Sequence, residues 1–269
     1  MEPIAEPTSR STAPVLVDRR GPVALITLNR PHALNAVNAP LARALGDALE
    51  EFENDPSLRV AVLTGAGRAF CAGADLKELA AGRSVHDAEH PERGFAGLVR
   101  HFLDKPLIAA VNGFALGGGT EIVLACDLAV MSEDTSLGLP EVKRGLVAAA
   151  GGLLRLHRQI PPKVAAEAAF TGDPINAEAA LRWGLVNRVV PSAEVVETAL
   201  VLAEAVAENA PLAVRASKRI MMRSSTGSDW DPVVWEMNES EFAAVRASSD
   251  AREGATAFAE KRRPVWTGA

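Results

Sequence analysis

Short, uninterrupted apolar runs, separated by glycine-rich turns and helical stretches, are the feature that most constrains this chain. The clearest runs are Arg59–Thr64 (RVAVLT), Leu107–Asn112 (LIAAVN) and Leu128–Met131. Such runs are typical of strands that are buried on both faces, as in a parallel sheet. Since parallel strands need long crossover connections, the intervening helical stretches predict an α/β fold wound by right-handed crossovers.

Further elements flank these strands. Val15–Asp18 and Val23–Asn29 are β-branched and are split by a Gly-Pro turn, which predicts two more strands. Pro40–Asn54 has the apolar spacing of an amphipathic helix. After about residue 150 only Asn187–Val190 has a strand pattern, and the predicted helices are Lys163–Phe170, Ala177–Trp183, Glu194–Glu208, Pro211–Arg223, Pro232–Arg246 and Ala251–Arg262.

The predicted organisation has three parts. A length of 269 residues accommodates one α/β core with a helical appendage. We expect a flexible N-terminal tail over residues 1–14, an α/β core over 15–195 and a helical C-terminal region over 196–269. The tail is acidic and proline-rich, without the apolar stretch of a secretory signal. Because no repeat or low-complexity linker separates them, the core and the helical region are expected to share one hydrophobic core.

Composition excludes several classes of protein. Apolar residues make up 48% of the chain, which predicts a packed globule. The net charge of −6 argues against a nucleic-acid-binding protein, which would normally be basic. No run of 18 apolar residues predicts a membrane span. The two cysteines, Cys71 and Cys126, fit a reducing compartment. We therefore expect a cytoplasmic protein with neither a nucleic-acid nor a membrane partner.

Glycine-rich loops after two of the buried strands are the first candidates for chemistry. They are Ala69–Leu76 (AFCAGADL) and Asn112–Glu121 (NGFALGGGTE). Unpaired N–H groups at the start of a helix bind anions, and a glycine there can face a developing oxyanion. The alternative is an ordinary strand-to-helix connection in each case, with Glu121 merely a favourable partner of the helix dipole.

A second carboxylate, Glu141, follows Pro140 and lies 20 residues after Glu121. A carboxylate beside a proline-fixed bend is usually solvated. If the fold brings the two carboxylates together in a partly dry site, however, they can divide the work of a general base and a general acid.

Several rival motifs are incomplete. The sequence GAGRAF resembles a dinucleotide fingerprint, but Phe70 stands where the third glycine belongs. There is neither a GxxxxGK[ST] phosphate loop nor a GxSxG nucleophile elbow. His86 and His90 lack a third metal ligand in a recognisable pattern, so surface histidines and no metal site are expected. Cys71 lacks a histidine placed to activate it, which favours a small buried thiol.

Three segments in series carry a family resemblance. Together with two later segments, they strongly resemble the crotonase (enoyl-CoA hydratase/isomerase) family. The three segments are RVAVLTGAGRAFCAGADLKEL, KPLIAAVNGFALGGGTEIVLACDLAV and LGLPEVKRGLVAAAGGLLRL, and the later two are FTGDPINAEAALRWGLVNRVV and the tail EGATAFAEKRRPVW. The likeness runs from about Val15 to Trp266. It implies a spiral of ββα units and a helical C-terminal trimerisation region, with assembly into homotrimers or homohexamers.

The resemblance also implies a reaction and its residues. An acyl-CoA thioester would bind with its carbonyl held by the N–H groups of Ala74 and Gly118. Glu121 and Glu141 match the two catalytic carboxylates of the hydratases, where one takes a proton from water and the other delivers one to C2. No cofactor is implied, since coenzyme A enters as part of the substrate.

Further substrate and coenzyme contacts follow by family position. The adenine end of the coenzyme is expected near Ala33, Ala72, Asp75, Leu76 and Lys77. Phe258 and Lys261 in the tail match positions that contact the coenzyme bound to a neighbouring subunit. The remaining implied contacts are Gly117, Pro140 and Ala149.

One departure from the family pattern bears on function. Where hydratases often read PGAGG, this chain reads Ala148-Ala149-Ala150-Gly151-Gly152, so the methyl group of Ala149 lies near the second carboxylate. The text ALRWGLVNRVV and the tail also resemble carnitinyl-CoA dehydratases. We therefore expect an enoyl-CoA hydratase, and the alternatives are a carnitinyl-CoA-type dehydratase, a double-bond isomerase of the same fold, or a non-catalytic acyl-CoA-binding relative.

Overall fold

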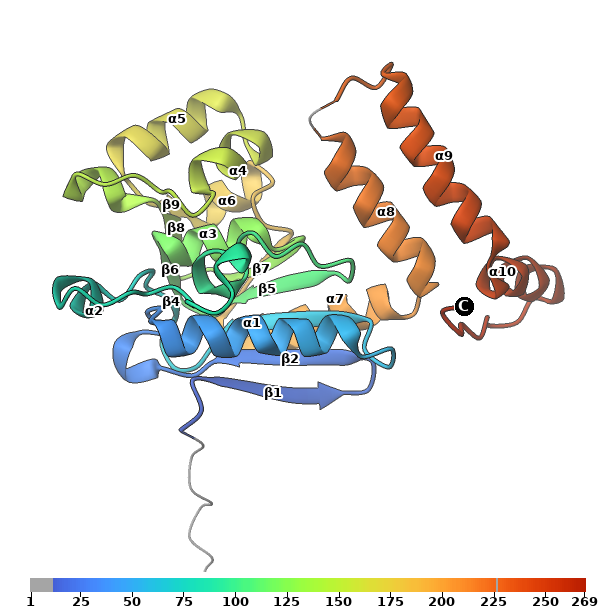
Figure 1. Ribbon diagram of the computed structural model, residues 1–269, viewed down its shortest axis with the longest axis horizontal. Helices are drawn as coiled ribbons and strands as arrows, with labels where there is room; N and C mark the ends of the chain where they lie inside the picture. Colours follow the sequence, from blue (N-terminus) through green and yellow to red (C-terminus); the bar gives the residue numbers. More distant parts are fainter. Residues whose placement is uncertain (1–11, 226) are drawn as a thin grey trace, which may run out of the picture.

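A twisted six-stranded sheet forms the centre of the molecule (Figure 1). The computed structural model describes residues 12–225 and 227–269, so most of the predicted tail lies outside the described residues. The strand order is β1-β2-β3-β5-β7-β10, in which only β1 and β2 pair antiparallel. The strands are β1 (Val15–Arg20), β2 (Val23–Leu28), β3 (Val60–Gly65), β5 (Leu107–Val111), β7 (Leu128–Ser132) and β10 (Arg188–Val190).

A second, four-stranded sheet lies beside the first, in the order β4-β6-β8-β9. Its strands are β4 (Ala69–Cys71), β6 (Phe114–Leu116), β8 (Ser136–Gly138) and β9 (Ile175–Asn176). Each of β3, β5 and β7 is followed by one short strand of this sheet and then by helical structure. The chain therefore repeats a ββα unit three times, and the glycine-rich loops lie where strands of the small sheet end.

Helices cover both faces of the large sheet and the end of the small one. The α-helices of this part are α1 (Ala39–Asn54), α2 (Leu76–Ala80), α3 (Gly118–Ala125), α4 (Gly152–Gln159), α5 (Pro162–Thr171), α6 (Ala177–Arg182) and α7 (Val195–Ala207). Short 3-10 helices are η1 (Pro31–Ala33), η2 (Pro91–Arg93), η3 (Phe95–Gly97), η4 (Pro140–Arg144) and η5 (Ser192–Glu194).

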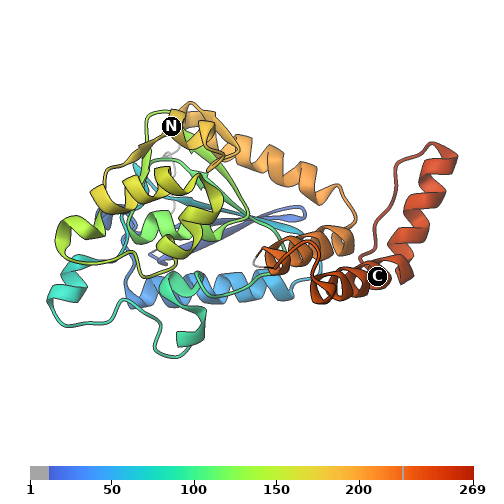
Figure 2. The same cartoon turned by 90° about the horizontal axis from the view of Figure 1, so that it is seen from above.

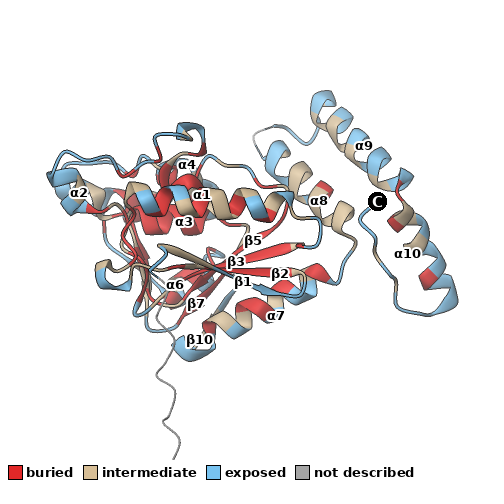
Figure 3. Ribbon diagram, turned by 60° about the horizontal axis from the view of Figure 1, so that its bottom comes forward, coloured by how far each residue is buried: buried red, intermediate tan, exposed pale blue. Residues whose placement is uncertain are grey.

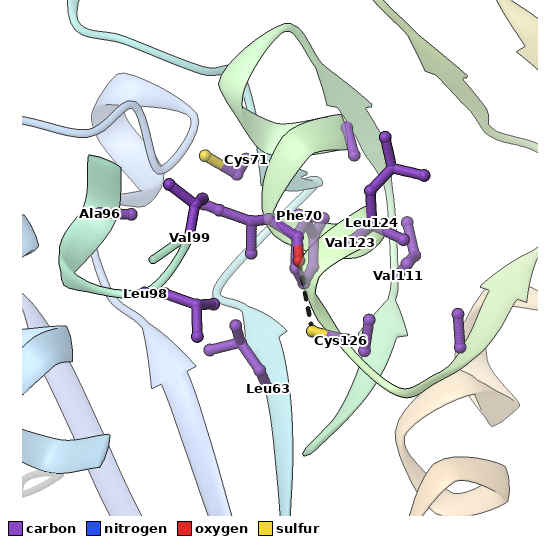
Figure 4. Close-up of a cluster of buried hydrophobic side chains, with 14 of the residues drawn as sticks. Leu63, Phe70, Cys71, Ala96, Leu98, Val99, Val111, Val123, Leu124 and Cys126 are labelled. Atoms are coloured by element: carbon purple, nitrogen blue, oxygen red, sulfur yellow. Dashed lines mark hydrogen bonds between the residues drawn. The ribbon is translucent and has the colours of Figure 1, made fainter. Parts of the chain in front are cut away.

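Two apolar clusters fix these layers. The larger one joins α1, α3 and the small sheet to one face of the large sheet, around side chains such as Phe52, Phe70 and Ile122. Figure 4 shows part of it, with Cys71 and Cys126 packed among leucine, valine and phenylalanine side chains. The smaller cluster packs α7 against the opposite face. The predicted boundary at residue 195 thus falls at the start of a helix whose inner face belongs to the sheet's core.

The last three helices extend away from this core. They are α8 (Pro211–Ser224), α9 (Pro232–Ala247) and α10 (Ser249–Glu260), and they lie to one side of the sheets in Figures 1 and 2. Figure 3 shows α9 almost entirely exposed or half-buried, and none of its described residues is buried. No described residue after α7 belongs to the two apolar clusters. The helix α8 is joined to the α/β part by polar contacts such as Lys218 Nζ to Asp127 Oδ2 at 2.7 Å.

The predicted long elements are confirmed to within one or two residues at each end, and several short ones were missed. The small sheet was not expected, and neither was α4 over Gly152–Gln159. Asn187–Val190 is not the sole strand after residue 150, because β9 pairs antiparallel with β8. Among the described residues, no helix combines the length and apolarity that crossing a bilayer requires.

Candidate active site

The glycine-rich loops, α2, η4 and the segment 85–100 enclose a cavity of about 670 Å³. Most of its lining is apolar, while its acidic groups come from two elements that are distant in sequence. Of the residues predicted from the sequence, the cavity is lined by Ala72, Ala74, Leu76, Gly117, Gly118, Glu121, Pro140, Glu141 and Ala149.

The two glycine-rich loops touch each other through their backbones. A Cβ atom at Gly73 would lie 2.8 Å from Leu116 O and 3.1 Å from Gly118 N, so no side chain fits between them. Gly73 also has φ +90°, a conformation that favours glycine. The sequence did not predict this contact between the two loops.

Two backbone donors remain unpaired at this contact. The bridge between Val37 and Ala74 uses Gly73 O and Asp75 N, so it leaves the Ala74 N–H free. Gly118 is the first residue of α3, where a helix supplies no acceptor. Within the part of the chain described, neither N–H has a hydrogen-bond partner. The pair can therefore bind one carbonyl oxygen that enters the cavity.

Glu121 connects two helices. It lies in the first turn of α3 and is 3% exposed, and its Oε1 accepts a 2.8 Å hydrogen bond from the Gly152 N–H, the first residue of α4. Burial raises the pKa of Glu121, and the nearby charge of Glu141 raises it further. The N–H groups of Gly152 and Ala150 and the charge of Arg155 oppose that rise in pKa. These groups all favour the ionised carboxylate.

Glu141 reaches the same place from η4. Pro140 begins this 3-10 helix and Gly145 ends it in a left-handed conformation, which fixes Glu141 within a single turn. A Cβ atom at Gly117 would lie 3.0 Å from Glu141 Oε1, so this carboxylate borders the N-terminus of α3. Its Oε2 is buried and has no partner among the described residues.

The two carboxylates differ in what surrounds them. Burial raises the pKa of Glu141, opposed by its own N–H group and by the charge of Arg144. Among the described residues, no neighbouring helix donates a hydrogen bond to Glu141, unlike Glu121, and its orphaned Oε2 favours the protonated form. A pair of carboxyl groups held in unlike environments can supply a base and an acid at one pH.

Sequence reasoning missed two residues that hold this arrangement together. Arg155 on α4 donates from Nη2 to Val99 O at 2.6 Å, and a Cβ atom at Gly151 would lie 2.1 Å from its Nη1. The ring of Phe95 covers Gly118, where a Cβ atom would lie 2.4 Å from Phe95 Cε1. The Arg155 signal was available in the motif text LLRL, but α4 had not been recognised as a helix.

Three of the residues predicted to contact the adenine end of the coenzyme do not line the cavity. The carboxylate of Asp75 caps α2 at Lys77 N (3.1 Å) and pairs with Arg30 (3.0 Å). Lys77 is exposed on α2, and Ala33 lies in η1 beside Leu34, whose carbonyl accepts from Ala72 N. All three lie close to lining residues in sequence or through hydrogen bonds, and their coenzyme contacts remain predictions.

Phe258 and Lys261 lie far from the cavity of their own chain. Both belong to the end of α10, on the opposite side of the molecule from α2 (Figure 1). Phe258 is 88% exposed, and Lys261 ends the helix with φ +54°. Contact with a bound coenzyme therefore requires a neighbouring subunit.

The predicted positions of the cysteines and histidines can be compared with the structure. Both cysteines are buried, and burial raises the pKa of the Cys71 thiol to about 12, which suits a packing residue. His90 faces Glu92 at 3.1 Å, outside the cavity. His86 is exposed, as the sequence predicts, and it also lines the cavity, where its ring lies edge-on to Phe95 at 6.1 Å between centroids.

Residues 18–269 match the sequence pattern of the enoyl-CoA hydratase/isomerase family. The chain belongs to this family. The match spans both sheets, the cavity and all the C-terminal helices, so the resemblance expected from the sequence is confirmed. Members of the enoyl-CoA hydratase/isomerase family are enzymes, and the cavity carries this member's candidate chemistry.

Relatives divide between two names. A carnitinyl-CoA dehydratase of Salmonella typhi is 47% identical over 254 residues, which are 93% of this chain and 97% of the relative. The crystal structure of an enoyl-CoA hydratase from Mycobacterium tuberculosis has a TM-score of 0.90 at 47% identity, covering 96% of this chain and 100% of the other. A carnitinyl-CoA hydratase from Mycobacterium avium is 54% identical with a TM-score of 0.78 and the same coverage. These similarities confirm the crotonase-like fold.

Proposed function

We propose that this protein is an enoyl-CoA hydratase, which adds water reversibly to the double bond of a trans-2-enoyl-CoA to give a 3-hydroxyacyl-CoA. One observation carries the proposal. The buried Glu121 and the half-buried Glu141, whose Oε2 atom is buried, border a cavity that also holds the unpaired N–H groups of Ala74 and Gly118. Hydration needs these components: a base, an acid and donors for an oxyanion.

The reaction follows from this chemistry. Hydrogen bonds from the Ala74 and Gly118 N–H groups polarise the thioester carbonyl and make C3 electrophilic. Ionised Glu121 takes a proton from water, whose oxygen attacks C3, and negative charge collects on the thioester oxygen. Protonated Glu141 then delivers a proton to C2. Loss of one oxyanion donor in comparable sites costs about 3 kcal/mol of transition-state stabilisation.

The roles of the two carboxyl groups rest on their partners. The Gly152 N–H group and the charge of Arg155 stabilise an ionised Glu121, which suits a base. The orphaned Oε2 of Glu141 suits a group that carries a proton. The proposed reaction uses no metal or redox cofactor, and coenzyme A belongs to the substrate.

The same residues run the reverse reaction, so a carnitinyl-CoA-type dehydratase is the second candidate. The 47% identity to the Salmonella typhi dehydratase favours it as strongly as the equal identity to the Mycobacterium tuberculosis structure favours hydration. The two candidates share a mechanism and differ in the acyl group and the direction.

A substrate panel tests the function. Trans-2-enoyl-CoAs of several chain lengths, followed by loss of the conjugated enone absorbance, should be hydrated by the unmodified protein. Glu121→Gln or Glu141→Gln should each lower kcat about 10²–10⁴-fold, the usual scale for a positioned acid or base. Coenzyme thioesters should still bind, since the oxyanion donors are main-chain groups.

Other outcomes identify other reactions. If Glu121→Gln is silent while Glu141→Gln abolishes conversion of 3-enoyl-CoA to 2-enoyl-CoA, the protein is an isomerase. Tight binding without turnover at any chain length would identify a binding protein. Ala149→Gly would then test whether the methyl group of Ala149 blocks the water.

A further inference from the structure

The cavity carries two arginines that the proposed reaction does not use. Arg100 and Arg144 both line it and both are exposed. Across residues 12–225 and 227–269, neither has a carboxylate within salt-bridge distance. The other ionisable groups of the lining are His86, Glu121 and Glu141. Apart from the catalytic pair, the cavity therefore presents positive charge.

Arg144 is the closer of the two arginines to the chemistry. It is the last residue of η4, three positions after Glu141, and its charge acts on the Glu141 carboxyl group. Its neighbour Lys143 is held elsewhere, because Nζ pairs with Asp173 Oδ1 at 2.6 Å and Lys143 does not line the cavity. One cation of this turn is thus neutralised outside the cavity, and the other is left facing it.

Apart from the catalytic pair Glu121 and Glu141, the described lining of the cavity has none of the groups that bind a quaternary ammonium ion. Such ions are held by carboxylates or by the faces of several aromatic rings. Phe95 is the single Phe, Tyr or Trp ring in the described lining, and its ring already packs on Gly118 and against His86. The wall near Ala149 is otherwise apolar, with exposed side chains from Leu146 and Val147.

We propose that Arg144 determines specificity by charge, so that the enzyme favours an enoyl-CoA whose acyl chain ends in a carboxylate, accepts a neutral chain and disfavours one ending in trimethylammonium. This inference rests on the proposed hydration, whose site it shares. It distinguishes the two candidate functions, because a carnitinyl group carries the disfavoured charge.

Three thioesters that differ in the charge at the end of the acyl chain provide the test: glutaconyl-CoA (anionic), crotonyl-CoA (neutral) and crotonobetainyl-CoA (cationic). For the unmodified protein, kcat/KM should fall in that order. A unit charge that faces the end of the acyl chain across a half-open cavity should change binding roughly tenfold. Arg144→Leu should therefore lower the glutaconyl to crotonobetainyl ratio of kcat/KM by at least tenfold. Lys143→Leu removes the same charge one residue away and should leave that ratio unchanged.

Two results would overturn the proposal. One is a preference of the unmodified protein for crotonobetainyl-CoA. The other is an Arg144→Leu variant whose glutaconyl to crotonobetainyl ratio of kcat/KM is unchanged. If this variant also has a higher KM for all three thioesters and is inhibited more weakly by free coenzyme A, Arg144 binds the coenzyme phosphates instead. Absence of turnover with all three thioesters would instead contradict the proposed hydration. The charge preference would then be decided by the dissociation constants of the same three compounds.

Discussion

Glu121 combines a structural role with a chemical one. Its carboxylate accepts a hydrogen bond from the N–H group of Gly152, the first residue of α4. A side chain of α3 thereby caps α4. It does so from a buried position, where an ionised carboxylate is unfavourable. The fold therefore holds Glu121 as an ionised carboxylate, which favours the proposed reaction but lowers the stability of the folded protein.

A stability measurement tests this trade. Burial raises the folded-state pKa of Glu121 above its ordinary value of 4.5, so the native state binds its proton more tightly than the unfolded state does. The contribution of this group to stability is greatest below pH 4.5 and declines as pH rises through the folded-state pKa. Glu121→Gln cannot ionise, so its stability relative to the unmodified protein should increase across that window. Urea midpoints from pH 4 to 8 would measure it.

The control is Glu51→Gln, which changes an exposed side chain on α1. Its effect on the urea midpoint gives the baseline for losing an exposed carboxylate, from which the effect of Glu121→Gln should differ. A Glu121→Gln variant that lost stability equally at every pH would show that the carboxylate contributes through its hydrogen bond alone.

Gly118 offers a second test at the scale of one residue. A methyl group there would lie 2.4 Å from Phe95 Cε1, so the ring or the N-terminus of α3 must move. Displacing an oxyanion donor should lower kcat about 10²–10³-fold in Gly118→Ala. Steady-state kinetics would measure the loss.

Phe95→Leu gives this prediction a matched partner. The double variant Phe95→Leu/Gly118→Ala removes the ring that meets the methyl group, so it should recover part of the lost kcat. Equal kcat values for the single and double variants would exclude the steric explanation.

At the scale of elements, α2 depends on Asp75. This helix has five residues and is held by the Asp75 cap and the pairing of Asp75 with Arg30, whose side chain also donates to Ala36 O. Asp75→Ala should cost about 2 kcal/mol of unfolding free energy, since it removes a cap and a largely buried ion pair. Leu76 and Leu79 of α2 line the cavity, so KM for coenzyme thioesters should rise more than kcat falls.

Asp75→Asn separates the two contributions. An asparagine can cap the helix but cannot pair with a guanidinium charge. Urea denaturation and steady-state kinetics should place it between the unmodified protein and Asp75→Ala. An Asp75→Ala variant with unchanged stability would mean that α2 does not need its cap.

The long elements could be predicted from the sequence because each carries its own periodicity. Leu107–Val111 is a continuous apolar run, and Ala39–Asn54 repeats apolar residues at helical spacing. The strands of the small sheet have two or three residues each, too few for a period, and their pairing is purely tertiary. α4 was missed because Leu153 and Leu154 are exposed, so its apolar pattern does not follow one buried face.

The cavity residues divide along the same line. Motif text pointed to Ala74, Gly118, Glu121 and Glu141, all of which the structure brings to one cavity. The motifs could not predict the contact of Glu121 with Gly152, because this hydrogen bond joins two residues that lie 31 positions apart on different helices. Nor could they show that Arg144 faces the cavity while Lys143 pairs outside it.

At the scale of the whole molecule, the C-terminal helices expose many apolar side chains. Met221 of α8 is 67% exposed, and Val233, Trp235 and Phe242 of α9 are 68%, 54% and 60% exposed. Monomeric proteins rarely expose contiguous apolar patches of large area. We propose that these helices form the contacts of a homotrimer or homohexamer.

Phe242→Glu tests the assembly. A charge within an apolar interface is costly, so the variant should sediment as a smaller species than the unmodified protein at micromolar concentration. If Phe258 and Lys261 serve a neighbouring subunit's coenzyme, KM for thioesters should rise in the same variant. A monomeric unmodified protein would contradict the proposal. An oligomer that persists in Phe242→Glu would place the interface elsewhere.

The glycine framework of the cavity has a consequence for how such an enzyme can diversify. At Gly73 and Gly119 a Cβ atom would lie 2.8 Å from Leu116 O and 2.0 Å from Cys71 O, so these positions admit almost no mutation. By contrast, Leu146 and Val147 on the facing wall are 55% and 62% exposed and can change freely. Selection for new substrates, in nature or in directed evolution, should therefore change residues such as Leu146 and Val147. The backbone donors of the oxyanion site should stay the same.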